Sequence, residues 1–173
     1  SYEESYGYML GDYVRDKDAV TASMLLTEMA AWYAAQGMTL FDALNALYEK
    51  YGYYAEKTHN LVMPGLDGLR DMAEVMRKVK DEPPTEIAGT EVVVRKDYND
   101  GTVHDCRTGA VTKMELSGSN VLRFELADGT TILARPSGTE PKIKVYILAR
   151  GKDAVDAAAN VEKYGAWAEA LKG

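Results

Sequence analysis

Residue types that build disulfide frameworks, metal sites and membrane spans are scarce in this sequence. Cys106 is the single cysteine among 173 residues, which excludes an internal disulfide framework and fits a reducing cytoplasm. The two histidines, His59 and His104, have no Cys or His neighbour at metal-ligand spacing, so no metal site is expected. No apolar run approaches the roughly 20 residues of a membrane span. These absences predict a cytoplasmic protein without a membrane partner.

An excess of positive charge is also lacking. The net charge of −7 argues against a nucleic-acid partner, because a phosphate backbone requires clustered Lys and Arg. A small phosphorylated ligand needs only a local group of donors and is not excluded. The composition, 46% hydrophobic and 27% charged, is that of a globular protein. The length fits one domain, or one small domain with a piece of another.

Hydrophobic periodicity predicts an α/β protein. Apolar residues recur at helical spacing over 18–36, 39–51, 66–80 and 153–171, with Asp18 as a helix cap and a capping box from Thr39 to Asp42. Strands are expected over 56–63, 87–96, 122–126, 130–134 and 143–148, and 97–118 is expected to be a long loop with one short strand near 110–116. Asp128-Gly129 is typical of a two-residue hairpin turn. The order predicts a sheet covered by helices on one face.

The loop of residues 135–142, with the sequence RPSGTEPK, has the side chains that a phosphate site requires. Arg135 can grip two oxygens with charge-assisted hydrogen bonds. Ser137 and Thr139 add hydroxyl and backbone donors, and Gly138 allows successive N–H groups to converge on an anion. Lys142 and Lys144 are secondary candidates, because each could also be a surface lysine. Composition alone leaves an ordinary long hairpin turn as an equal alternative.

This loop and its continuation through residues 143–147 resemble the C-terminal phosphate-binding loop of the α-D-phosphohexomutase superfamily, in particular its bacterial phosphoglucomutase/phosphomannomutase branch. Residues 119–124 and Asp128-Gly129 follow the same order as in that family. The resemblance implies an α+β terminal domain, an antiparallel sheet with helices on one face like that of the TATA-box-binding protein. It also implies that residues 1–52 are the remnant of the third, sugar-binding domain and that 53–173 form the C-terminal domain.

The opening residues supply a second similarity. The segment 3–7, EESYG, resembles the sugar-binding loop of the third mutase domain, which implies that Glu3 and Ser5 bind sugar hydroxyls. Lys17 takes the place of a ligand-contacting lysine. Without the resemblance, these residues would be interpreted as a solvated loop and a charged helix start. The absence of an initiator Met and of any lead-in to this segment suggests an excised fragment.

The resemblance implies a parent enzyme that interconverts hexose 1-phosphate and hexose 6-phosphate through a bisphosphorylated intermediate, with Mg²⁺ and hexose 1,6-bisphosphate as cofactors. The catalytic serine and the aspartate-rich metal loop of that family have no counterpart here, so the chain is expected to bind a phosphorylated hexose and to be inactive alone. A non-enzymatic phosphosugar-binding module and a structural interaction domain are the alternatives. The apolar residues of 18–52 predict self-association, with packing on the terminal domain or disorder as other outcomes.

Overall fold

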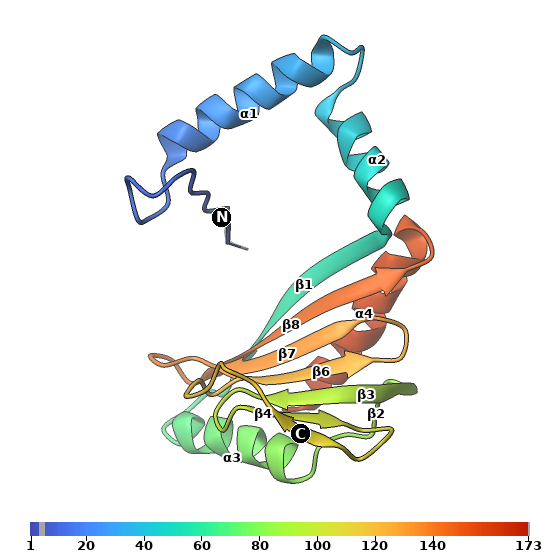
Figure 1. Ribbon diagram of the computed structural model, residues 1–173. Coiled ribbons are helices and arrows are strands. Elements are labelled where there is room, and N and C mark those ends of the chain that lie inside the picture. The colour runs from blue at the N-terminus through green and yellow to red at the C-terminus, as the bar shows by residue number, and fades with distance from the viewer. Residues whose placement is uncertain (4–5, 173) are drawn as a thin grey trace. The chain divides into compact units, whose positions relative to one another are not determined.

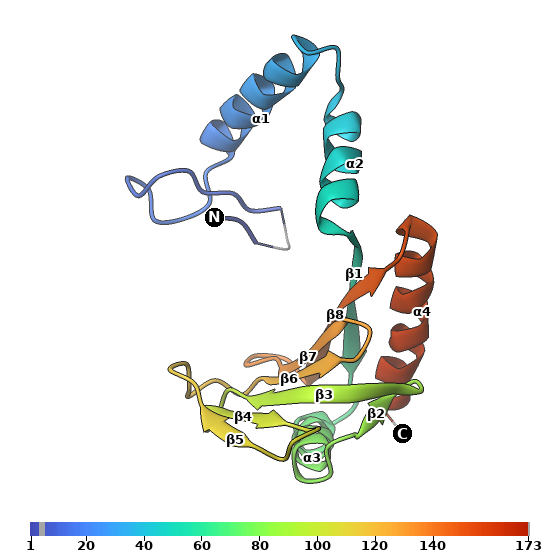
Figure 2. The ribbon, with the colours of Figure 1, turned by 45° about the vertical axis from the view of Figure 1, so that its right-hand side comes forward.

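The computed structural model describes residues 1–3 and 6–172, and the chain divides into two compact units, Ser1–Tyr51 and Gly52–Gly173 (Figures 1 and 2). The first unit contains helices α1 (Ala19–Ala34) and α2 (Leu40–Tyr51). The second unit contains one sheet and two further helices. Among the described residues, no helix has the length and apolar character needed to cross a bilayer.

Side-chain caps start the two helices of the first unit, as the sequence predicts. Asp18 Oδ1 accepts from the backbone N–H of Val20 at 2.9 Å and fixes the first turn of α1. Before α2, the Asp42 carboxylate accepts from the Thr39 N–H at 2.8 Å, and Thr39 Oγ1 accepts from the Asp42 N–H at 3.1 Å. The capping box is therefore complete, with Asp in place of the usual Glu.

The apolar side chains of these helices stay largely in solvent. Every residue of α1 is at least partly exposed, and Ala43 is the buried residue of α2. The exposed fraction is 57% for Met24, 59% for Trp32 and 49% for Leu47. Such an accumulation of exposed apolar residues is typical of an interaction surface rather than of a finished monomer surface.

The second unit is an antiparallel sheet whose strands lie in the order β1-β8-β7-β6-β3-β4-β5, with β2 paired to β3. The strands and helices follow one another as β1 (Tyr53–Val62), α3 (Gly68–Asp81), β2 (Glu86–Ile87), β3 (Thr90–Asp97), β4 (Thr102–Asp105), β5 (Val111–Lys113), β6 (Leu122–Leu126), β7 (Thr131–Pro136), β8 (Lys142–Gly151) and α4 (Ala154–Ala170). β1, the first strand in sequence, is therefore the neighbour of β8, the last one.

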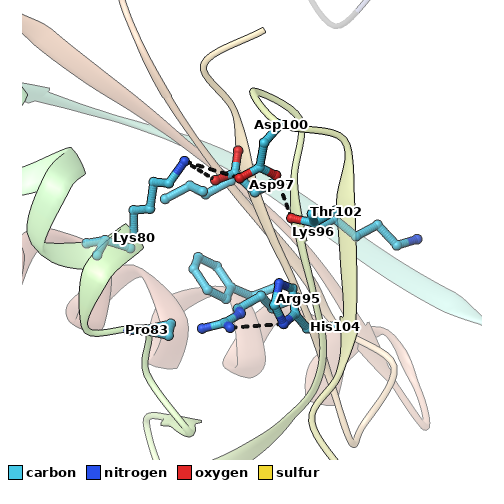
Figure 3. Close-up of a pocket in the computed structure, with 11 residues that line it drawn as sticks. Lys80, Pro83, Arg95, Lys96, Asp97, Asp100, Thr102 and His104 are labelled. Atoms are coloured by element: carbon cyan, nitrogen blue, oxygen red, sulfur yellow. Dashed lines mark hydrogen bonds and ion pairs between the residues drawn. The ribbon is translucent and has the colours of Figure 1, made fainter. Parts of the chain in front are cut away.

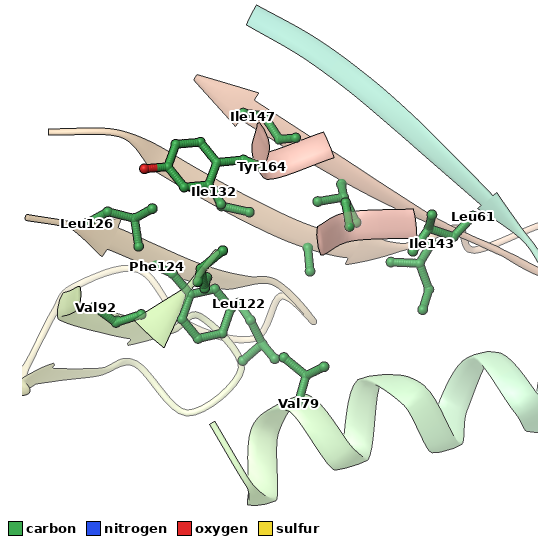
Figure 4. Packing of buried hydrophobic residues seen from close by; sticks show 14 of the residues in the cluster. Leu61, Val79, Val92, Leu122, Phe124, Leu126, Ile132, Ile143, Ile147 and Tyr164 are labelled. Carbon is green, nitrogen blue, oxygen red and sulfur yellow. The ribbon is translucent and has the colours of Figure 1, made fainter. Parts of the chain in front are cut away.

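Alternation along the strands places the core on one face of this sheet. Ile143, Val145 and Ile147 of β8 are fully buried, whereas the residues between them stay partly exposed. Met76 and Val79 of α3 join the same cluster, as do Val161, Tyr164 and Ala168 of α4. Figure 4 shows Val79 and Tyr164 packed toward the strand residues of this cluster. Both helices therefore cover one face, as expected, and the other face carries the polar residues of the sheet.

Three connections differ from the sequence-based expectation. The β6–β7 turn has three residues rather than two, because Leu126 N–H donates to Thr130 C=O and Gly129 has a φ of +86°. The strand expected over 87–96 is interrupted by a turn at Ala88-Gly89, with φ of +47° and +76°, which pairs β2 with β3. The segment 97–118 contains the expected short strand, which is β5, and in addition β4, which was not expected.

Candidate functional site

The loop of residues 135–142 joins β7 to β8 and closes on itself through its backbone. Ser137 N–H donates to the carbonyl of Lys142 at 2.8 Å. Ser137 Oγ in turn accepts from the N–H groups of Thr139 and Glu140, at 3.4 and 3.3 Å. Two successive amides therefore converge on one oxygen atom, which is the arrangement by which backbone N–H groups hold an oxyanion.

Two cations flank this loop on the face of the sheet that the helices leave open. Arg135 of β7 and Lys144 of β8 are direct cross-strand partners, and Lys144 lies between the buried residues Ile143 and Val145. Among the described residues, neither cation forms an ion pair. Like charges placed opposite each other destabilise a sheet, so this pair favours a site that an anion neutralises.

Lys142 is the third cation of the loop, and it is already paired. Its ammonium group contacts the Glu140 carboxylate. That hydrogen bond, together with the positive charges of Lys142 and Lys144, lowers the pKa of Glu140. Glu140 therefore stays ionised, and Lys142 is less available to a ligand than Arg135 and Lys144 are.

The exit of the loop is fixed by a close backbone contact with the start of α3. Met63 N–H donates to the Pro141 carbonyl at 2.8 Å. Gly68, the first residue of α3, packs against both Met63 and Pro141. A Cβ atom added to Gly68 would lie 2.2 Å from the Met63 carbonyl oxygen and 3.0 Å from Pro141 Cβ. Only the hydrogen of a glycine fits at this contact.

The opening loop brings together two of the residues that the sequence singles out. Lys17 Nζ lies 3.2 Å from Glu3 Oε1, although 14 residues separate them. The stem of Lys17 crosses Gly7, where a Cβ would come within 2.3 Å of it. Glu3 and Lys17 line a cavity of about 200 Å³ within the first unit. Ser5, the other predicted sugar-binding residue, lies outside the described residues.

A further polar cluster, which sequence patterns did not indicate, lies at the end of α3 (Figure 3). Lys80 Nζ contacts Asp97 at 2.6 Å and Asp100 at 3.5 Å, and the hydrogen bond to Asp97 raises the pKa of Lys80. On the other side of the pocket, Arg95 contacts His104 Nδ1 at 3.1 Å. The cluster joins α3 to the β3–β4 hairpin, so we interpret it as structural.

No ligand set for a metal ion is present in the part of the chain that the structure describes. No group of three or more His, Cys, Asp or Glu side chains in residues 1–3 and 6–172 is placed to hold an ion. These described residues therefore offer no ligand set for the Mg²⁺ that the resemblance implies for the parent enzyme.

Comparison with known proteins agrees with this geometry. Residues 60–162 match the family model for the C-terminal domain of phosphoglucomutase/phosphomannomutase, and residues 1–51 match the model for its alpha/beta/alpha domain III. The phosphoglucomutase of Staphylococcus aureus strain bovine RF122 / ET3-1 is 37% identical over 147 residues, covering 85% of this chain and 26% of the relative. That of strain N315 is 35% identical over 161 residues, covering 93% of this chain and 29% of the relative.

A solved structure shows the same fold. The open form of pp63/parafusin, a phosphoglucomutase from Paramecium, matches with a TM-score of 0.59 at 19% identity, over 97% of this chain and 29% of that one. The chain thus spans less than a third of the length of the relatives it matches. It belongs to the phosphoglucomutase/phosphomannomutase family, with matches to domain III and to the C-terminal domain of that family.

Proposed function

We propose that this chain supplies the phosphate-binding and sugar-binding parts of a cytoplasmic phosphohexomutase that interconverts hexose 1-phosphate and hexose 6-phosphate through a bisphosphorylated intermediate. The observation that carries the proposal is the convergence of the Thr139 and Glu140 amides on Ser137 Oγ, beside the unpaired Arg135 and Lys144. Membership of the family supports the reaction class. The single cysteine supports a reducing compartment.

In this proposal, the loop holds the phosphate that is not being transferred. Arg135 gives a bidentate, charge-assisted contact to two phosphate oxygens, and Lys144 adds a point charge next to it. A phosphate oxygen then takes the place of Ser137 Oγ at the loop amides, which frees the hydroxyl to donate to the ligand. The amides of Gly138 and Thr139 and the ammonium of Lys142 complete the contacts.

Glu3, Ser5 and Lys17 bind the sugar in the same proposal. The carboxylate of Glu3 accepts from two vicinal hydroxyls, and Ser5 both donates and accepts. Lys17, already 3.2 Å from Glu3, fixes the carboxylate in position for this contact. Binding energy gained far from the reacting phosphoryl group then orients the ligand for transfer.

The phosphoryl donor, Mg²⁺ and hexose 1,6-bisphosphate belong to the rest of the parent enzyme in this proposal. Mg²⁺ supplies charge neutralisation at the transferring phosphoryl group when it is bound there. A loop that recognises charge rather than stereochemistry accepts the phosphate of either orientation of the intermediate. The same loop therefore serves both half-reactions.

A titration of the purified chain with inorganic phosphate, followed by amide NMR shifts, tests the proposal. We expect a dissociation constant of about 1 mM, with the largest shifts at Ser137, Thr139 and Glu140. Arg135→Ala should remove most of the binding. Arg150→Ala is the matched control, since Arg150 of β8 is likewise an exposed arginine on the open face. Equal affinities for wild type and Arg135→Ala would refute the assignment of the site.

A further inference from the structure

A half-buried arginine lies on the helix-covered face of the sheet, at the edge of the hydrophobic core. Arg95 of β3 stands between its direct cross-strand partners, Phe124 of β6 and His104 of β4. Because directly opposite residues of an antiparallel pair point to the same face, Arg95 lies on the same side as Phe124, which is buried in the core. The guanidinium is therefore on the face opposite to the one that carries Arg135 and Lys144.

Two basic neighbours of Arg95 are neutralised by carboxylates, and Arg95 is not. Lys80 lies 2.6 Å from Asp97, which joins α3 to the sheet, and Arg107 lies 2.7 Å from Glu91. Arg95 forms no ion pair in the described part of the chain, and its strand is already held in place by backbone pairing. A half-buried charge without a counter-charge costs folding free energy, so the stability of the fold does not explain Arg95.

The contact with His104 orients the guanidinium and leaves its charge in place. Arg95 Nη2 lies 3.1 Å from His104 Nδ1 (Figure 3). A guanidinium can only donate, so Nδ1 accepts this hydrogen bond and the ring proton is on Nε2. His104 is thus a neutral acceptor in this contact. The other N–H groups of Arg95 have no hydrogen-bond partner among the residues that the structure describes.

Two cavities meet at this pair of side chains. Their volumes are about 180 and 360 Å³, and Pro83, Arg95 and His104 line both of them. The larger volume falls within the range of about 300 to 1,000 Å³ that is usual for small-molecule sites. Pro84 and Val92 add apolar wall to the larger cavity. A small molecule that reaches the guanidinium therefore finds apolar surface for its carbon skeleton.

The acidic residues of the larger cavity limit the charge of such a molecule. Glu91 is paired with Arg107. Asp105 Oδ1 accepts from the backbone N–H groups of Arg107 and Thr108, at 2.9 and 2.8 Å, and these hydrogen bonds lower the pKa of Asp105. Asp105 therefore stays ionised without contacting Arg95. A site with one uncompensated cation and an ionised carboxylate nearby favours a monoanion over a phosphate dianion.

We propose that Arg95 binds the carboxylate of a small organic acid in this cavity, at a site separate from the loop of residues 135–142. The free edge of the guanidinium fork gives two parallel hydrogen bonds to the two carboxylate oxygens. His104 positions the fork from its other side. Pro83 and Pro84 contact the carbon skeleton of the acid. The proposal does not depend on phosphate binding at the loop.

Titration of the full chain with benzoate, and with benzamide as the uncharged probe, tests this site. Binding is followed by amide NMR shifts and by the rate at which iodoacetamide alkylates Cys106, the single cysteine, which is exposed and lines the larger cavity. The variants are Arg95→Gln, His104→Asp and His104→Asn. Arg77→Gln, an exposed arginine of α3 outside both cavities, and Arg135→Ala are the controls. Urea unfolding verifies that each variant is folded.

Benzoate is expected to bind wild type with a dissociation constant of about 1 mM and to slow the alkylation of Cys106, whereas benzamide does neither. Arg95→Gln should weaken benzoate at least about tenfold, as loss of a charge-assisted contact implies. His104→Asp should do the same, because a carboxylate of the chain then occupies the guanidinium. His104→Asn offers a neutral acceptor at the same distance from the backbone and should keep the wild-type affinity.

Several outcomes would overturn the proposal. Equal benzoate affinity in wild type and Arg95→Gln, or no binding to wild type, shows that Arg95 holds no carboxylate. Loss of binding in Arg135→Ala places the carboxylate at the loop instead. Equal loss in His104→Asp and His104→Asn contradicts the role given to the free charge of Arg95. Unchanged binding in both control variants, together with the difference between the two His104 variants, supports the site.

Discussion

Replacing Gly68 with Ala is expected to destabilise the second unit, although helix propensity alone predicts a gain in stability. Gly68 is the first residue of α3, and Ala is the better helix former by about 1 kcal/mol in a helix interior. The φ of Gly68 is not in the left-handed region, so the backbone conformation also permits Ala. A prediction from sequence alone would therefore be a small gain in stability.

The close packing around Gly68 reverses the sign of this expected stability change. The new Cβ would lie 2.2 Å from the Met63 carbonyl oxygen, where a carbon and an oxygen in contact need about 3.3 Å. The atoms must separate by about 1 Å, and Pro141 stands at 3.0 Å on the other side. Overpacking of this kind costs about 1 to 3 kcal/mol. Loss of the hydrogen bond from Met63 to Pro141 adds about 1 kcal/mol. We expect a net loss of about 2 to 3 kcal/mol.

Urea unfolding of the chain measures this loss directly, and a phosphate titration shows whether the loop moves with it. We expect weaker phosphate binding in Gly68→Ala, because Pro141 ends the loop. For stability the control is Gly138→Ala, where a Cβ meets no atom within 4 Å and the φ is not left-handed. Stability of Gly68→Ala equal to or above that of wild type would show that the contact with Met63 is not a constraint.

Three further outcomes follow from the structure. Burial and the hydrogen bond to Asp128 raise the pKa of Tyr164 to about 12, so the folded chain keeps a proton that the unfolded chain loses near pH 10. Stability should fall as pH rises from 10 to 12, by at most about 2 to 3 kcal/mol, and chemical unfolding of Tyr164→Phe should show a flatter profile. The exposed apolar residues of α1 and α2 should make the chain self-associate. Light scattering should show smaller species for the double variant Met24→Lys/Leu47→Lys than for wild type. A wild type that is monomeric at high concentration would contradict this expectation. The chain should have no mutase activity alone; turnover of glucose 1-phosphate above that of a heat-inactivated sample refutes that expectation.

Local patterns in the sequence were sufficient for the helix starts and for the core strands. Asp18 and Thr39 cap the helices where the sequence places them, because capping depends on neighbours within three residues. The alternation in β8 gave the buried face correctly. The turn at Ala88-Gly89 escaped detection, because both its residues have positive φ and Ala is an uncommon choice for the first position.

Some features of the candidate site could likewise be predicted from the sequence, and others depend on the fold. The loop of residues 135–142 is contiguous, so its donors and its family resemblance are visible in the sequence. The opposition of Arg135 and Lys144 depends on the register of β7 with β8, which hydrogen bonds set. The contact between Lys17 and Glu3 spans 14 residues, and it needs Gly7 to leave room for the lysine stem.

The sequence by itself was sufficient to indicate the family, most of the helices and strands and the residues that we propose hold a phosphate, because these depend on side chains close together in the chain. Only the tertiary structure decided which of those residues already have partners, such as Lys142 with Glu140, and which groups from distant segments share the cavity beside the loop. That cavity is lined by residues of α3 together with residues from 97–99, 120–122 and 136–138. That packing arises from burial of apolar area, which is non-directional and leaves no local pattern in the sequence.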